Sequence, residues 1–168
     1  MSGATRALDG VNPWLKAVAG LCGPPVAALA AGACALLNPG RARPLSPVLQ
    51  KELAARFPEL DLTRVRITDR AVLPLQPHFA GITLGHRIYV RGPLDDSPAT
   101  RRLLAHELAH VRQFAELGFA GMARAYGALW LRHGYTRHPM EEEAREREKE
   151  EGRREKEEGK RKKVEGRG

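Results

Sequence analysis

The stretch from Leu103 to Gln113 reads L-L-A-H-E-L-A-H-V-R-Q and constrains the rest of the chain most strongly. Its centre places His106 and His110 four positions apart, with Glu107 beside the first. Residues four apart on a helix share one face, so both imidazoles can reach one metal ion while Glu107 acts as a general base. A catalytic zinc site uses three protein ligands and one water. The motif therefore predicts two metal ligands, His106 and His110, and a catalytic Glu107.

The sequence around the motif predicts a helix over residues 98–117. Asp96 or Ser97 can serve as its N-cap, and Pro98 suits the first helical position. Gly118 is suited to end the helix as a C-cap. Apolar residues recur at helical spacing and can bury one face: Leu104, Leu108, Val111 and Ala115.

Two further helices are expected after the motif. Helical spacing of apolar residues continues over 119–133 and should end at Gly134. Pro139 can open a third helix with three glutamates in its first turn, where acidic side chains also complement the helix dipole. The residues alone leave five candidates for the third metal ligand: His133, His138, Glu141, Glu142 and Glu143.

An H-E-x-x-H helix followed by a helix that carries E-x-x-A resembles the gluzincin group of zinc metallopeptidases. In that pattern the third ligand is the glutamate three residues before the alanine. Ala144 occupies the alanine position, so the resemblance implies Glu141 as the ligand. It also implies one zinc ion per chain.

The chain also resembles, more narrowly, the small H-E-x-x-H core domain found near bacterial contractile injection systems and toxins. That family shows three blocks, of which the motif helix is the third. The first block, D-L-x-x-V-R-hydrophobic, is matched by Asp61, Leu62, Val65, Arg66 and Ile67. The second, A-x-T-x-G-x-x-I-Y, is nearly matched, with one extra residue before Thr83, by Ala80, Thr83, Gly85, Ile88 and Tyr89. The resemblance covers about residues 45–148 and implies a zincin-like fold with a zinc site.

The fold class expected is α+β, with a short β-sheet packed on the motif helix and two helices after it. A helix over 47–57, capped by Ser46, should come first. Strands are expected over 65–68 and 82–90, with an irregular connection over 70–79. The strand at 82–90 could pair with an extended peptide substrate, because pairing to a sheet edge makes little demand on sequence. His78 and His86 read as surface residues, although His86 on this strand could touch a substrate.

The implied activity is zinc-dependent hydrolysis of peptide bonds, with Glu107 taking a proton from the attacking water. A donor should stabilise the oxyanion. Tyr135, His133 and His138 are candidates by position, and Tyr135 is preferred. The alternative is a zinc-stabilised, catalytically silent interaction or scaffold domain of a secretion or toxin system.

Residues 1–43 are expected to form an apolar segment and linker, separate from a domain over 44–150. Ala17 to Leu37 carries no charged residue and is long enough to cross a bilayer, although Gly23-Pro24-Pro25 interrupts it. Three interpretations stay open: membrane association through 14–37, a signal peptide cleaved near Ala31-Gly32-Ala33, and a helical hairpin packed on the domain. Cys22 and Cys34 fit no zinc or redox spacing.

Charge is distributed unevenly along the chain. Residues 141–168 hold 11 acidic and 11 basic residues, so the other 140 residues, with 17 basic and 9 acidic, carry the whole net charge of +8. No aromatic–basic interleaving accompanies this charge, so nucleic-acid binding is not expected. Repeated glycines in the tail at 151–168 favour a frayed helix that passes into disorder. The bacterial cytoplasm or inner membrane is the expected location, rather than the exterior.

Overall fold

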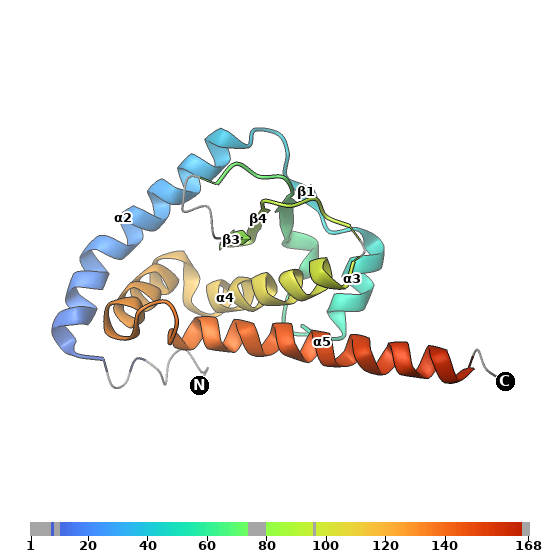
Figure 1. Cartoon of the computed structure of the whole chain (residues 1–168). Coiled ribbons are helices and arrows are strands. Elements are labelled where there is room, and N and C mark those ends of the chain that lie inside the picture. Colours follow the sequence, from blue (N-terminus) through green and yellow to red (C-terminus); the bar gives the residue numbers. More distant parts are fainter. Residues whose placement is uncertain (1–7, 9–10, 74–79, 96, 166–168) are drawn as a thin grey trace.

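The computed structural model describes residue 8 and residues 11–73, 80–95 and 97–165. It has the expected α+β architecture, in which a small sheet packs on the helix that carries the motif (Figure 1). The elements run in the order α2 (Pro13–Leu37), β1 (Arg43–Pro44), α3 (Pro47–Ala54), the 3-10 turn η1 (Leu62–Arg64), β2 (Arg66–Thr68), β3 (Gly81–Leu84), β4 (Arg87–Val90), α4 (Pro98–His133) and α5 (Pro139–Glu165).

The sheet has the strand order β1-β2-β4-β3, with β2 and β4 parallel and the two outer pairs antiparallel. The single strand expected over 82–90 is wrong, because the chain forms a hairpin there. Leu84 pairs with Arg87, which leaves Gly85-His86 as a two-residue loop. Gly85 has φ of 68°, a conformation that glycine adopts without steric cost and that two-residue hairpin loops require.

The strand expected over 65–68 is confirmed as β2, and Ser46 caps α3 as predicted. β1 lies across the expected boundary at residue 43, because Arg43 pairs with Ile67 in the sheet. Residues 70–73 form no helix or strand. Residues 74–79, with His78, and Asp96 lie outside the described residues.

Helix α4 carries the motif and provides one side of the core. Ser97 is its N-cap, with the Ser97 hydroxyl accepting a hydrogen bond from the Thr100 amide. The break expected at Gly118 is present as a kink, with φ of 69° and ψ of 167°, and Gly134 ends the helix. The first half of α4 packs on the sheet and on α3 through a cluster of buried side chains: Leu53, Phe57, Val65, Ile67, Ile88, Val90, Leu104, Leu108 and Val111.

Residues Pro13–Leu37 form one continuous helix, α2, so the expected hairpin is wrong, whereas the expected packing on the domain is present. Pro24 and Pro25 lie inside α2 without ending it. A proline inside a helix lacks the amide donor and crowds the carbonyl four residues earlier. The residue before Pro24 is Gly23, whose missing Cβ removes a further clash with the proline ring. This part of α2 packs closely on the second half of α4.

The C-terminal segment is helical to Glu165, so the disorder expected after Glu151 is wrong for the described residues. Tertiary ion pairs hold this part of α5. Arg56 Nη1 lies 2.5 Å from Glu151 Oε2, and Arg102 Nη1 lies 2.6 Å from Glu155 Oε2. The tail sequence therefore continues the helix that contributes Glu141, and its last turns project beyond the rest of the described protein (Figure 1).

Candidate metal centre

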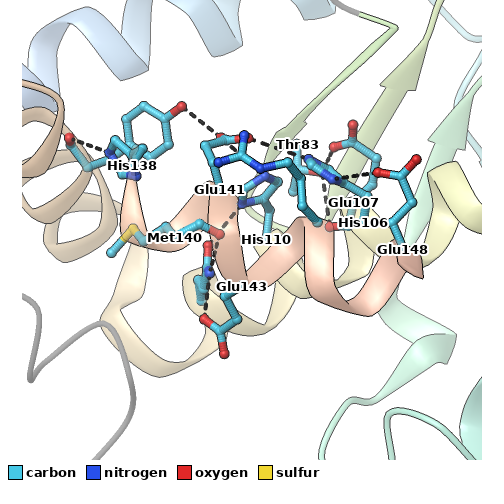
Figure 2. Close-up of polar contacts among 12 residues, drawn as sticks. Thr83, His106, Glu107, His110, His138, Met140, Glu141, Glu143 and Glu148 are labelled. Carbon is cyan, nitrogen blue, oxygen red and sulfur yellow. Dashed lines mark hydrogen bonds and ion pairs between the residues drawn. The ribbon is translucent and has the colours of Figure 1, made fainter. Parts of the chain in front are cut away.

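Three potential metal ligands meet between α4 and α5. His106 and His110 lie one turn apart on α4, and Glu141 projects from the first turn of α5 (Figure 2). Their nearest ligand atoms lie within 4.8 Å of one another. Glu141 Oε2 is 3.6 Å from His106 Nε2, and Glu141 Oε1 is 3.4 Å from His110 Nε2.

These distances fit a zinc ion. Zinc bonds nitrogen and oxygen at about 2.0–2.2 Å in a tetrahedron, which places neighbouring ligand atoms about 3.3–3.5 Å apart. Glu141 Oε2 is also buried and has no hydrogen-bond partner among the described residues. A buried carboxylate oxygen without a partner is costly in free energy, and a cation in the cluster would satisfy it.

Gln113 determines which nitrogen of His110 faces the cluster. Its amide nitrogen donates to Glu143 Oε2 at 2.9 Å and to the Met140 carbonyl at 3.2 Å. Its carbonyl oxygen therefore faces His110 Nδ1, at 2.9 Å. Because a carbonyl only accepts, Nδ1 must carry a proton, so Nε2 is the nitrogen directed at Glu141, and Nε2 offers a lone pair to a metal when the imidazole is neutral.

His106 is oriented like His110, with Nε2 facing Glu141. Glu148, two turns after Glu141 on α5, places Oε2 3.5 Å from His106 Nδ1. This carboxylate favours a proton on Nδ1 of His106 and so presents Nε2 to the cluster. Figure 2 shows His106 lying between Glu148 and Glu141.

Glu141 is itself held by Tyr126, whose hydroxyl donates to Oε1 at 2.8 Å. The Tyr126 ring stacks on His138 with centroids 4.1 Å apart, and His138 Nε2 lies 3.0 Å from the Tyr126 carbonyl. His138 is fully buried in this supporting role, so it does not serve as a rival ligand. His133 also lies outside the ligand cluster of the described residues.

Glu107 lies beside the cluster under strand β3. The Thr83 hydroxyl donates to Glu107 Oε2 at 2.6 Å (Figure 2). Gly81 leaves room for the other oxygen, because a Cβ there would lie 2.7 Å from Glu107 Oε1. Burial raises the pKa of Glu107, and the charges of His110 and His106 and the Thr83 hydrogen bond oppose that rise only in part.

The charges of the cluster reinforce one another. Burial alone would raise the pKa of Glu141, but the adjacent imidazoles of His106 and His110 and the hydrogen bond from Tyr126 outweigh burial and hold that pKa well below its ordinary value. Burial alone would lower the pKa of His110, and the hydrogen bond and charge of Glu141 raise it instead. The metal-free cluster thus keeps an anionic carboxylate aimed at two imidazoles, which is a donor set that attracts a divalent cation.

The three glutamates of the first turn of α5 have different surroundings. Glu142 is exposed, and Glu143 is paired with Arg112 and Gln113, so only Glu141 lies in the cluster. Tyr135, the predicted oxyanion donor, is 43% exposed. Burial and the negative charge of Glu141 raise the pKa of its hydroxyl, which keeps the phenol protonated and able to donate. His86 lies in the hairpin loop between β3 and β4.

The supporting groups Thr83, Gln113, Tyr126 and Glu148 did not emerge from the sequence reasoning. For Gln113 and Glu148, their helical spacing from a candidate ligand could have indicated this role. Gln113 is one turn after His110, and Glu148 is two turns after Glu141, so each shares a helix face with a ligand. Thr83 and Tyr126 come from other elements, and only tertiary structure brings them to the site.

Comparison with protein families finds a match for the sheet and the first part of the motif helix. Residues 44–117 match the model of the eCIS core domain, where eCIS stands for extracellular contractile injection system. The match is shorter than the expected 45–148, and it includes His106, Glu107 and His110 but ends before Glu141. No curated protein and no solved structure matches the chain. The sheet and the motif helix of this chain are thus similar to a domain associated with bacterial injection systems.

Proposed function

We propose that this protein is a zinc-dependent peptidase in which His106, His110 and Glu141 hold the metal and Glu107 is the general base. The observation that carries the proposal is the convergence of two Nε2 atoms on the buried Glu141 carboxylate, one near each oxygen, of which Oε2 has no hydrogen-bond partner among the described residues. Zinc supplies Lewis acidity and lowers the pKa of a bound water to about 7.

In this proposal Glu107 moves the proton. Its Oε2 accepts the hydrogen bond from Thr83, which leaves Oε1 to accept a proton from a water at the cluster. Burial raises the pKa of Glu107, which makes the carboxylate a stronger base than it is in water. The same group can later deliver the proton to the leaving amine. Tyr135 is proposed as the donor to the oxyanion.

Strand β3 is the proposed contact for the substrate backbone. It is the last strand of the sheet and pairs with β4 on one side only, among the strands that the structure describes. Thr83 of β3 contacts Glu107, so a peptide paired along the outer side of β3 would lie close to the proposed base.

The test is cleavage of casein and a mixed peptide library by the full chain, loaded with zinc and then treated with a chelator. Cleavage should require zinc. Glu107→Gln should keep one zinc per chain and lose cleavage about 10²- to 10⁴-fold. His106→Ala should lose both zinc and cleavage, and Glu142→Gln, at an exposed position one residue from Glu141, should lose neither.

Full cleavage by a clean Glu107→Gln preparation would refute the proposed mechanism. Zinc binding that survives in the wild type without any cleavage would favour the second function, a zinc-stabilised interaction or scaffold domain. The buried position of Glu107 favours the enzyme, because a purely structural site gains nothing from a buried carboxylate that is not a ligand.

A further inference from the structure

Helix α2 presents a long apolar stripe that the rest of the described protein does not cover. Trp14, Leu21, Leu29 and Leu36 are 69%, 80%, 75% and 82% exposed. They are spaced by seven, eight and seven residues, which corresponds to about two helical turns each time, so they lie on one face along the whole helix. Single exposed apolar residues are ordinary, but a continuous stripe of this length marks an interaction surface.

The opposite face of α2 belongs to the fold. Gly23 meets α4 so closely that a Cβ would lie 2.6 Å from the Ala123 carbonyl oxygen, and Ala19 contacts Gly127. At the other end Cys34 is fully buried, and the Asn38 amide donates to the Val72 carbonyl. A cleaved signal peptide has to be separable from the folded domain. Helix α2 is packed into the fold at both ends, so it does not have this property.

The chemistry of the stripe fits lipid better than protein. No charged residue occurs from Ala17 to Leu37, whereas a helix that pairs with a protein helix normally has charged residues beside its apolar seam. Helix α2 is long and apolar enough to cross a membrane. Only 6% of its most apolar part is buried in the protein, so it is not a core helix. Trp14 lies near one end, and tryptophan is enriched at the membrane–water interface.

Basic residues flank the stripe. Lys16 lies in the first turn of α2, and Arg41 and Arg43 follow its end, both with exposed side chains. Anionic lipid headgroups attract basic residues near a bilayer surface. The pattern is therefore an apolar surface with basic residues at both ends.

We propose that α2 lies along the surface of an anionic bilayer, with Leu21, Leu29 and Leu36 in the acyl region, while its small-residue face stays docked on α4. The helix then anchors the protein at a membrane without crossing it. The metal cluster takes no part in this contact, so the proposal stands or falls independently of zinc binding.

The native thiols allow a direct test. Cys22 is exposed and Cys34 is buried, so an environment-sensitive maleimide should label Cys22 alone in the folded full chain. Addition of vesicles of phosphatidylcholine with phosphatidylglycerol should shift the emission of the probe to the blue, and the protein should float with the vesicles. Pure phosphatidylcholine should bind it more weakly.

Substitutions on the exposed stripe provide the specificity control. Leu21→Gln and Leu29→Gln remove no internal contact and should each lower vesicle partitioning about tenfold. Val48→Gln, at a position on α3 that is 65% exposed, is the matched control and should bind like wild type. No flotation on either vesicle, or equal binding by the leucine variants, would overturn the proposal. A dimer that these leucine variants dissociate, without vesicle binding, would do the same and assign the stripe to a second copy.

A disulfide tests the docked arrangement. Ala19 Cβ lies 3.4 Å from a Cβ built on Gly127, close to the separation of about 3.5–4.5 Å in disulfides. Ala19→Cys with Gly127→Cys, in a Cys22→Ser background, should lock α2 on α4 after oxidation. Unchanged flotation of the oxidised protein supports a surface-lying helix. Flotation that is lost on oxidation and restored by reduction would mean that α2 leaves α4 to insert, which contradicts the proposal.

Discussion

Gly81 is the residue whose replacement tests the placement of Glu107 most sharply. A Cβ at this position would lie 2.7 Å from Glu107 Oε1 and 3.1 Å from the Tyr89 carbonyl oxygen. In Gly81→Ala the carboxylate must therefore move, while the three metal ligands stay in place. Because a displacement of about 1 Å can cost a hundredfold in rate, cleavage should fall by about that factor with zinc content unchanged.

The matched control is Gly92→Ala, where no atom lies within 4 Å of the added Cβ. That variant should cleave at the wild-type rate. Cleavage by Gly81→Ala at the wild-type rate would show that Glu107 does not act from the position described here.

Gln113 should control zinc affinity without touching the metal. Gln113→Met keeps approximately the same shape but cannot accept the proton of His110 Nδ1 or donate to Glu143. Loss of such a supporting group typically weakens metal binding 10- to 100-fold. Competition against a chromophoric chelator would measure this loss, and ¹⁵N NMR of the imidazoles should show His110 losing its single tautomer. Glu142→Gln should change neither quantity, and wild-type affinity in Gln113→Met would contradict the assignment.

At the scale of residues, the sequence predicted the three candidate metal ligands better than the residues that hydrogen-bond to them and orient them. Helical spacing was sufficient for His106 and His110, because both ligands lie on one element. Glu141 needed a family resemblance, since the residues alone left five candidates. The residues that fix proton positions and orientations, such as Thr83 and Tyr126, come from distant elements and have no periodic signal.

Helix α4 depends on an acidic residue just before its start. Asp95 Oδ1 accepts hydrogen bonds from the Ser97 amide at 3.1 Å and from the Thr100 hydroxyl at 2.6 Å. Hydrogen bonds from Ser97 and Thr100 lower the pKa of Asp95 to about 2, from an ordinary 3.8. A depressed carboxyl pKa contributes stability that is present above the unfolded pKa and is lost as the pH falls through the folded pKa.

Asp95→Asn should therefore be less stable than wild type at pH 5, and the difference should shrink as the pH falls from about 4 towards 2. Urea unfolding of both proteins at pH 5 and at pH 2.5 would measure it. A stability difference that is the same at both values would mean that the charge of Asp95 is irrelevant.

The glycines of α5 test whether its distal part is helical in solution. Gly159 has no atom within 4 Å of an added Cβ, so Gly159→Ala should stabilise the helix by about 0.5–1 kcal/mol. Gly152 differs, because its Cβ would lie 3.2 Å from Arg102 Cδ and disturb the Arg102–Glu155 pair. Hydrogen exchange over residues 153–163 should slow in Gly159→Ala and not in Gly152→Ala. Identical, fast exchange in both variants and in the wild type would indicate a disordered tail.

At the scale of elements, the predictions succeeded where one element has clear local signals and failed where tertiary contacts decide. Ser97, Gly118 and Gly134 are capping signals, and the structure uses all three. The hairpin at Gly85 was missed because its strands are only four residues long, and residues 82–90 were interpreted as one strand rich in β-branched and aromatic residues. The distal part of α5 was assigned to disorder because its stabilising pairs, to Arg56 and Arg102, lie outside the tail sequence.

At the scale of the whole molecule, the candidate metal cluster joins α4 to α5. Glu141, Glu143 and Glu155 tie α5 to α4, and Glu151 ties it to Arg56, which lies just after α3. The α+β class was predictable from the order of the expected elements. The position of α2 was not, because its docking depends on Gly23 and Ala19 meeting small residues of α4, and small residues give no amphipathic pattern.

The measurement that tests the central claim most directly is the zinc content of the purified full chain, compared with Glu141→Ala and Glu142→Ala after equilibration with zinc and gel filtration. We predict one zinc per chain in the wild type and in Glu142→Ala, and loss of bound zinc in Glu141→Ala. Absence of zinc from the wild type, or equal zinc content in all three proteins, would contradict the assignment of His106, His110 and Glu141 as a metal centre.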